Sequence, residues 1–233
     1  MKNKFWIVNM PTYSMIAFVI LNIIAMLCYP GGNLNNPDQI GYFFSYNFFS
    51  DLGMTISHSD ENNIISCILF NTSLCIVGVT FTMLFYSIKN LFPEFKILSL
   101  IATLLGLLGG ISFIGVAFTP SNLFLDLSGN PWLHSIFAHW IFRSLSAVSI
   151  IYSILIIKTK DFENKYAYNF VIFGIMLLAY VLYSELYLKD PRMFPEYLIK
   201  HVLSQKMVVL WMIMSIYLYS LGLGKYLLNK NNG

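Results

Sequence analysis

Six long apolar stretches make up most of the 233-residue chain. A helix that crosses a bilayer needs about 20 consecutive, mostly apolar residues, because lipid offers the backbone no hydrogen-bond partners. Only 11% of the residues are charged, against about 25% in ordinary soluble domains. The sequence therefore predicts an all-α polytopic membrane bundle in a single domain, 1–233. Its six predicted transmembrane helices cover residues 11–29, 63–88, 97–118, 133–157, 167–188 and 202–226.

The basic residues in the loops predict which way the bundle faces. Cytoplasmic loops of membrane proteins carry an excess of Lys and Arg. One set of connections holds Lys2, Lys4, Lys89, Lys96, Lys158, Lys160, Lys165, Lys225 and Lys230, whereas the other holds Lys189, Arg192 and Lys200. Both termini are therefore predicted to be cytoplasmic, with the loops 30–62, 119–132 and 189–201 facing outward. We expect the plasma (inner) membrane of a prokaryote, and no basic run indicates a nucleic-acid partner.

Several ionisable residues lie inside the apolar stretches. Arg143 and His139 fall in the fourth, Glu185 near the end of the fifth and Lys206 near the start of the sixth. An ionisable group within a spanning helix is costly, so it usually faces the bundle interior and marks a functional site. With the predicted orientation, these groups fall in the outer half of the membrane, as does Asn71 of the second stretch. The sequence therefore predicts a polar site in the outer half of the bundle.

One face of the fourth stretch is polar along its length. At about 100° per residue, that face holds Ser135, His139, Arg143, Ser146, Ser149 and Ser153. Serines in membrane helices often hydrogen-bond to a neighbouring helix, which is the interpretation we favour for them. Arg143 needs a carboxylate, a cluster of carbonyl groups or water as its partner. Among the carboxylates, Glu185 is preferred over Asp51 and Asp126. A structural ion pair and a ligand-binding one both stay open.

The first outer loop is rich in aromatic residues, which favour the membrane interface. Its segment 41–53 contains Ser50 and Asp51. We expect a short helix in the interface, or a re-entrant segment at the mouth of the bundle, with Asp51 directed toward the polar site. The alternative is that Ser50 or Asp51 caps a helix. The following stretch, 58–61, is interpreted as solvated.

The spacing of the histidines argues against a metal site. His134 and His139 are five residues apart, which is about 140° around a helix. The zinc helix pattern places its histidines four residues apart instead. We therefore predict no cofactor, with zinc expected only if the protein is an enzyme.

Two glycines of the third stretch, Gly106 and Gly110, have the spacing that permits close helix packing. Gly109 and Gly115 lie nearby in the same stretch. We interpret Gly106 and Gly110 as internal packing residues, with a homodimer through them as the alternative.

The motifs together resemble a known family. They are Tyr29-Pro-Gly-Gly, the segment 47–53 with its Ser50-Asp51-Leu52-Gly53 core, Leu69-Phe-Asn71, and Phe118-Thr-Pro120 before a histidine-led helix. The chain resembles the six-helix membrane proteins of the domain of unknown function 998 family, which are distantly similar to DRAM-type proteins. The resemblance covers most of the chain and implies six helices, cytoplasmic termini and a polar first outer loop. It marks Ser50, Asp51, Asn71, His134 and His139 as positions of interest and implies no reaction.

We predict first a binding module whose pocket, open to the outer leaflet, takes a lipid headgroup or a small polar ligand. In this hypothesis Arg143 and Lys206 hold an anionic group, Arg143 through its bidentate fork. Membrane lipids are then the expected partners. The candidate ligand-binding residues are Ser50, Asp51, Asn71, His134, His139, Arg143, Glu185, His201 and Lys206.

Two alternatives rank below binding. The hypothesis ranked second is a metal-dependent intramembrane lipid hydrolase, with zinc held by His134, His139, His201 and Asp51 to activate a water. The helix count and the histidine spacing argue against it. The third is a proton-coupled transporter that uses Glu185, His139 and Arg143 as a relay. We find no repeated halves and no broken helix pair of the kind that transporter folds show.

Overall fold

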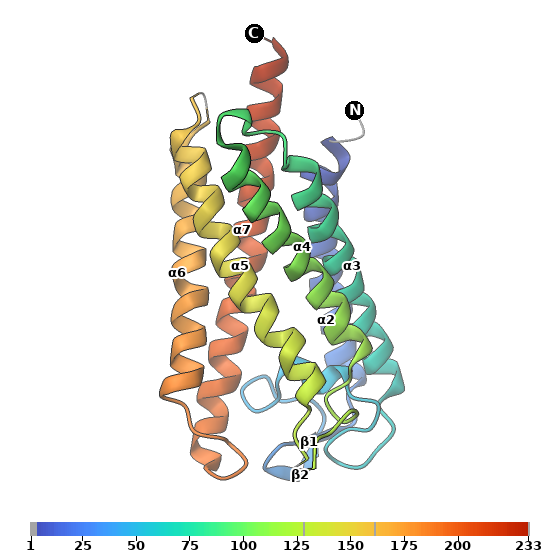
Figure 1. The fold of residues 1–233 in the computed structure, drawn as a ribbon. Helices are drawn as coiled ribbons and strands as arrows, with labels where there is room; N and C mark the ends of the chain where they lie inside the picture. Colours follow the sequence, from blue (N-terminus) through green and yellow to red (C-terminus); the bar gives the residue numbers. More distant parts are fainter. Residues whose placement is uncertain (1–3, 128, 161, 233) are drawn as a thin grey trace.

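Figure 1 shows the computed structural model of the chain, which describes residues 4–127, 129–160 and 162–232. Six helices in these ranges are long and apolar enough to cross a membrane, which confirms the predicted six-helix bundle. They are α2 (Met10–Cys28), α3 (Ile64–Ile88), α4 (Lys96–Phe118), α5 (Trp132–Lys158), α6 (Asn164–Leu186) and α7 (Leu198–Asn232). A π-helix, η1 (Phe5–Asn9), extends α2 backward.

The helix ends differ from the predicted spans mainly in α7, which has 35 residues. At 1.5 Å per residue it is about 52 Å long, whereas the hydrocarbon core of a bilayer is about 30 Å thick. Its C-terminal end extends past the other helices in Figure 1. Helical hydrogen bonding thus continues through polar residues on both sides of the predicted membrane span 202–226, which was defined from hydropathy. The 3₁₀ turns η3 (Pro93–Phe95) and η4 (Pro195–Tyr197) lead into α4 and α7.

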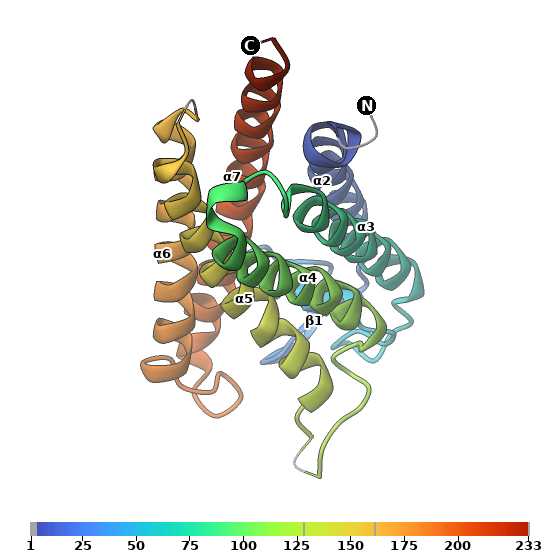
Figure 2. The ribbon, with the colours of Figure 1, turned by 45° about the horizontal axis from the view of Figure 1, so that its top comes forward.

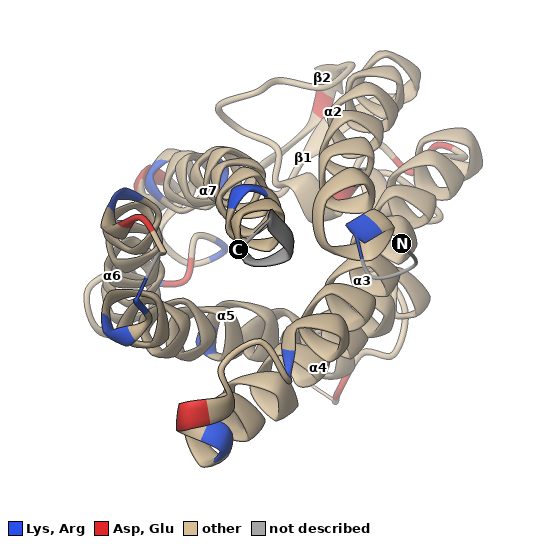
Figure 3. Cartoon of the chain, turned by 90° about the horizontal axis from the view of Figure 1, so that it is seen from above, with Lys and Arg blue, Asp and Glu red and all other residues tan. Residues whose placement is uncertain are grey.

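The helices form a ring in which neighbours in sequence are neighbours in space. Each of α2 to α7 contacts the next, and α7 also contacts α2, as the view along the bundle shows (Figure 3). Both termini lie at the same end of the bundle, which we call the terminal end (Figure 1). The opposite end, which we call the loop end, carries the long loops, and the α4–α5 loop projects away from the bundle in Figure 2. The cytoplasmic position of the termini stays a prediction.

Aromatic side chains fill the terminal half of the bundle. Phe85 of α3 stacks on Tyr152 of α5 with ring centroids 5.8 Å apart. Phe170 of α6 stacks on Tyr219 of α7 at 4.2 Å, and Tyr219 lies 6.0 Å from Tyr152. All four side chains are fully buried. Aromatic pairs of this kind each add about 0.5–1.5 kcal/mol beyond their burial, so this cluster ties four helices together.

The glycines of α4 serve packing against α3. A Cβ added at Gly106 would overlap the Phe85 ring, and one at Gly110 would overlap Thr82 and the carbonyl of Gly78. Only a residue without a side chain lets these backbones approach so closely. The geometry agrees with internal packing, and a homodimer through Gly106 and Gly110 would require α3 to move aside.

Two serines of α5 hydrogen-bond to α6, as the favoured interpretation expected. Ser146 Oγ donates to the carbonyl of Gly174 at 3.0 Å, and Ser153 Oγ donates to the carbonyl of Ala167 at 3.1 Å. Ser149 Oγ instead donates to the carbonyl of Ser146 in its own helix. The polar face of α5 therefore acts in its terminal half as a seam between two helices.

The first outer loop is a folded unit rather than a flexible connection. It begins with an antiparallel hairpin of β1 (Gly31–Asn33) and β2 (Asn36–Ile40) and continues to the 3₁₀ helix η2 (Phe49–Gly53). The short helix was expected, but the hairpin was not. Leu52 and Gly53 are buried against α3, where a Cβ at Gly53 would overlap the Phe70 ring. Helix η2 therefore sits in the mouth of the bundle and carries Ser50 and Asp51 there.

Candidate functional site

A cavity of about 510 Å³ lies at the loop end, where η2 and the outer loops meet α5, α6 and α7. We call it the outer cavity. Its volume falls within the range of about 300–1,000 Å³ that is common for small-molecule sites. Of the residues predicted to form a site, those that line it are Ser50, Asp51, His134, His139 and Glu185.

Asp51 is the buried carboxylate of this cavity, with 4% of its surface exposed. Its Oδ2 accepts hydrogen bonds from the backbone N–H of Phe48 at 2.9 Å and from Asn47 Nδ2 at 3.1 Å. Its Oδ1 lies 3.4 Å from Nε2 of His58. The two interpretations of Asp51 are thus both met, because one oxygen caps η2 while the residue also lines the cavity.

His58 is a cavity residue that the sequence analysis missed. The interpretation of residues 58–61 as solvated is wrong for this side chain, which is 20% exposed and faces Asp51. The loop folds back through a bridge between Ile56 and Asn62, and Ser57 donates its N–H to the carbonyl of Glu61 at 2.9 Å. Nothing in the local sequence signals this turn toward the bundle, because the partner carboxylate comes from a different segment.

Two tyrosines, the buried Tyr29 and the partly buried Tyr42, lie near enough to Asp51 to sense its charge. Burial, and then the nearby charge of Asp51, raise the pKa of Tyr29 and of Tyr42. Both phenols therefore stay neutral at ordinary pH. Tyr42 Oη donates to the carbonyls of Asn47 and Phe48, each at 3.1 Å. The segment that precedes Asp51 is thus held by side chains as well as by its own backbone.

The two histidines of α5 both line the cavity but differ in burial and in hydrogen bonding. His134 is buried, and its Nδ1 lies 2.7 Å from the carbonyl of Thr119 at the end of α4. His139 is exposed and also lines the cavity. His134 is therefore oriented by the protein, whereas the described residues place no hydrogen bond on the ring of His139.

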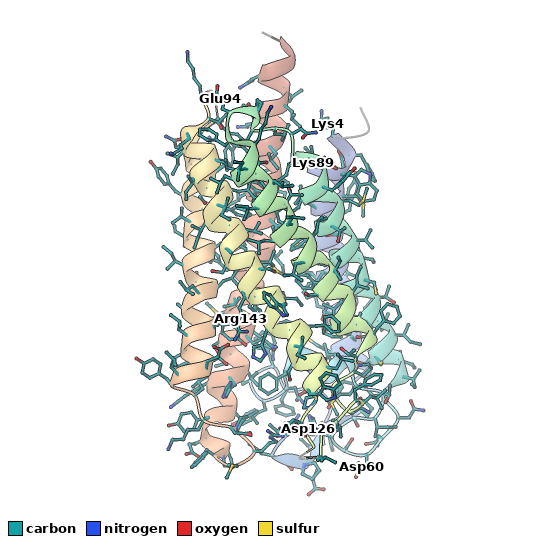
Figure 4. All side chains as sticks on the ribbon, in the orientation of Figure 1. Lys4, Asp60, Lys89, Glu94, Asp126 and Arg143 are labelled. Carbon is teal, nitrogen blue, oxygen red and sulfur yellow. The ribbon has the colours of Figure 1, made fainter. Side chains whose placement is uncertain are left out.

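Arg143 and Glu185 form the ion pair that the sequence analysis preferred. Arg143 Nη2 donates to Glu185 Oε1 at 2.5 Å and joins α5 to α6. Arg143 is labelled on α5 in Figure 4. Their side chains are 47% and 36% exposed, so the pair is not buried. Glu185 lines the outer cavity, whereas Arg143 is not among the lining residues. The pair therefore contributes the carboxylate of Glu185 to the cavity lining, while the guanidinium of Arg143 lies outside that lining.

Lys206 does not line the cavity. Its Nζ donates to the carbonyls of Phe44, at 2.5 Å, and of Asn47. It also lies 4.6 Å from the ring centroid of Phe44, 5.1 Å from that of Tyr42 and 5.4 Å from that of Phe49. Only 4% of Lys206 is exposed. The ammonium group is therefore occupied in holding the first outer loop onto α7.

Asn71 and His201 also hold loops rather than line the cavity. Asn71 Nδ2 donates to the carbonyl of Gly53 at 3.5 Å and to Cys67 Sγ at 3.2 Å. His201 Nε2 lies 3.0 Å from the carbonyl of Lys189, and its ring centroid is 6.4 Å from that of Phe48. These residues position the surrounding loops.

Further polar groups reach the cavity from the α6–α7 loop and from α7. Asp190 and Arg192 both line it and pair with each other, with Arg192 Nη2 2.5 Å from Asp190 Oδ2. The hydrogen bond from Arg192 lowers the pKa of Asp190. Gln205 lines the cavity as well, and its Oε1 accepts the N–H of Phe49 at 3.1 Å. This last contact fastens η2 to α7.

A second, smaller cavity of about 80 Å³ lies among the six long helices and shares part of its lining with the outer cavity. We call it the apolar chamber. All six long helices line it, through Phe18, Phe70, Phe113, Ile141, Leu177 and Met212 among others. The two cavities share Ser50, His134, Ala138, Phe142 and Gln205. A cavity that mixes charged, polar and apolar lining residues thus shares a wall with one whose lining is almost entirely apolar.

The histidines do not assemble into a metal site. Within the described residues, no group of three or more His, Cys, Asp and Glu side chains could hold a metal ion. His134 and His139 lie on the cavity wall, but His201 is directed to the carbonyl of Lys189. The ligand set that the hydrolase alternative needs is therefore not gathered at one point.

Comparison with known proteins gives no relative. No protein-family model matches the chain, and neither a curated protein nor a solved structure matches it. The resemblance to the domain of unknown function 998 family therefore stays a prediction.

Proposed function

We propose that this multi-pass membrane protein binds an amphipathic molecule at its loop end, with the polar part in the outer cavity and an apolar part in the apolar chamber. A membrane lipid that offers its headgroup is the natural ligand of this kind. The observation that carries the proposal is the common wall of the two cavities, formed by Ser50, His134, Ala138, Phe142 and Gln205. A ligand that crosses this wall would meet carboxylates and histidines on one side and only apolar side chains from six helices on the other.

The alternatives have no comparable support. The hydrolase hypothesis needs converging ligands, and His201 is held away from His134 and His139 by its contact with Lys189. The transporter hypothesis needs a polar path to the terminal end, where Phe85, Tyr152 and Tyr219 fill the bundle. Binding is the function that the geometry supports best.

The test is to place a bulky side chain at the wall that the two cavities share. Ala138 lines both cavities, so Ala138→Phe places a ring where the ligand would cross. Ala179→Phe is the matched control, because Ala179 is an exposed residue of α6 that lines neither cavity. Each protein is purified in mild detergent, checked for a monodisperse elution profile, and analysed by native mass spectrometry for co-purified lipid.

We expect the wild type and Ala179→Phe to retain a lipid and Ala138→Phe to lose it. Equal retention by all three proteins would overturn the proposal, and so would a wild type that stays bare after incubation with total membrane lipid. If Ala138→Phe does not fold, His139→Leu replaces it. His139 is an exposed cavity residue with no hydrogen bond among the described residues, so its replacement changes the polarity of the wall without opening a contact.

A further inference from the structure

The charges that line the outer cavity are the reverse of those expected for an anion site. The lining includes the carboxylates of Asp51, Glu185 and Asp190, against the single guanidinium of Arg192 among the described residues. The two cations that were predicted to hold an anionic group are engaged elsewhere. Arg143 pairs with Glu185 outside the lining, and Lys206 binds backbone carbonyls. The cavity therefore offers negative charge to a ligand.

Two of the three carboxylates already have a cation of their own. Glu185 is paired with Arg143 at 2.5 Å, and Asp190 with Arg192 at 2.5 Å. Both pairs are more than a third exposed on each side, so solvent already screens them. Asp51 differs from both in its burial and in its partners. A positive charge on a ligand would therefore contribute most to binding at Asp51.

The two oxygens of Asp51 differ in their partners, because Oδ2 has two hydrogen-bond donors and Oδ1 has only a long contact with His58 among the described residues. Oδ2 accepts from Asn47 and from the N–H of Phe48. Oδ1 accepts no hydrogen bond from the described residues, and the nearest cationic candidate, His58 Nε2, lies 3.4 Å away. A charge-assisted N–H···O bond is usually about 2.7–2.9 Å long. At 3.4 Å the contact with His58 leaves room for a shorter, charge-assisted bond, so Oδ1 is an acceptor that a ligand in the cavity could complete.

The apolar part of the lining also suits a cation. Phe48, Phe142 and Tyr180 line the same cavity, and the rings of Phe142 and Tyr180 meet edge to face with centroids 5.0 Å apart. The faces of aromatic rings attract ammonium groups, most strongly where water is excluded. A buried carboxylate and aromatic rings in the lining of one cavity are a combination that selects positive charge.

We propose that the polar end of the ligand is an alkylammonium group that donates a hydrogen bond to Asp51 Oδ1 and lies beside these rings. This inference rests on the proposed function and names the chemistry of the headgroup. The ammonium group can come from an aminophospholipid of the outer leaflet or from a free amine in solution. The apolar chamber favours the lipid, because a short apolar segment of such a molecule could enter it while the ammonium group stays in the outer cavity.

The charge of Asp51 can be removed with little change in shape. Asp51→Asn keeps an oxygen that can accept the N–H of Phe48. Asp60→Asn is the matched control, because Asp60 is exposed, lies in the same loop and does not line the cavity (Figure 4). Its backbone φ of 60° is also one that Asn tolerates well. Asp51→Asn therefore removes a carboxylate at the site, and Asp60→Asn removes one away from it.

The probes are phospholipids with identical chains, added to the detergent-purified protein and counted by native mass spectrometry. Phosphatidylethanolamine carries the ammonium group, N-acetyl phosphatidylethanolamine has it neutralised, and phosphatidylglycerol lacks it. We expect the wild type and Asp60→Asn to prefer phosphatidylethanolamine by about tenfold, the value of one hydrogen bond to a charged group. We expect Asp51→Asn to lose that preference. Calorimetric titration with free ethanolamine separates the two sources, because binding of the free amine at the same strength would assign the site to a soluble ligand.

Each further outcome decides the inference. Equal binding of the three lipids by the wild type, or a preference for phosphatidylglycerol, would overturn the ammonium assignment while leaving lipid binding in place. Unchanged selectivity in Asp51→Asn would also overturn it. If Asp51→Asn does not fold, the comparison of the acetylated and free-amine lipids on the wild type still decides. Failure of the proposed function is a different result, namely no lipid retained and no effect of Ala138→Phe.

Discussion

Asn47 holds the first outer loop in place, so its replacement by alanine should release the segment that carries Asp51. Its side chain is fully buried and makes four hydrogen bonds. Nδ2 donates to the carbonyl of Gly32 at 2.7 Å and to Asp51 Oδ2 at 3.1 Å. Oδ1 accepts from Gln39 Nε2 at 2.8 Å and from the N–H of Phe43 at 3.0 Å. One amide thus joins the hairpin, the aromatic segment and η2.

The magnitude follows from these four bonds. A hydrogen bond within a protein contributes about 1 kcal/mol net, so their loss should lower the free energy of opening the loop by about 4 kcal/mol. Every 1.4 kcal/mol is about a tenfold change in an equilibrium constant. Protection of the loop amides against hydrogen exchange should therefore fall about a thousandfold.

Hydrogen–deuterium exchange measured by mass spectrometry on peptides from residues 31–53 tests this expectation. Asn35→Ala is the control, because Asn35 is exposed and its side chain has no hydrogen bond to the described residues; its backbone N–H donates to Asn33 Oδ1 at 2.9 Å. Peptides from α3 and α4 report on global unfolding in the same experiment. Unchanged protection of residues 31–53 in Asn47→Ala would refute the reasoning, as would an equal loss in Asn35→Ala.

Three other perturbations have defined outcomes. Gly110→Ala should destabilise the α3–α4 contact by about 1–3 kcal/mol, because the added methyl would overlap Thr82 and the carbonyl of Gly78. A thermal unfolding curve in detergent measures this loss of stability. An unchanged midpoint would contradict the expectation. Glu185→Gln should lower the free energy of unfolding by only about 0–1 kcal/mol, since the pair with Arg143 is exposed. A large drop in the midpoint of thermal unfolding would contradict this expectation. The pairing of Asp190 with Arg192 lowers the pKa of that carboxyl from its ordinary 3.8, so its contribution to stability is present above that pH and is lost as the pH falls through the lowered value. Arg192→Ala should return the pKa of Asp190 toward 3.8 in a carboxyl NMR titration, and an unshifted curve would show that the pair does not form in solution.

The sequence alone predicted what depends on local regularities. Hydropathy located the six spans, because every membrane helix must bury a continuous apolar length. Helical periodicity placed the serines of α5 on one face, and Ser146 and Ser153 do bond to α6. The need of Arg143 for a carboxylate on a neighbouring helix predicted its pair with Glu185. Each of these inferences uses a rule that acts within one helix or between adjacent helices.

The tertiary structure decided the orientation of the polar groups around the outer cavity. Lys206 lies on a spanning helix, as a ligand-binding cation would, yet the folded first loop brings two carbonyls to it and removes it from the cavity. His58 lies in a stretch that looks solvated, yet the bridge between Ile56 and Asn62 turns it toward Asp51. These outcomes depend on hydrogen bonds between segments far apart in the sequence. Hydropathy and periodicity carry no information about such bonds, so the sign of the charge in the cavity emerged only when the loops were folded over the helices.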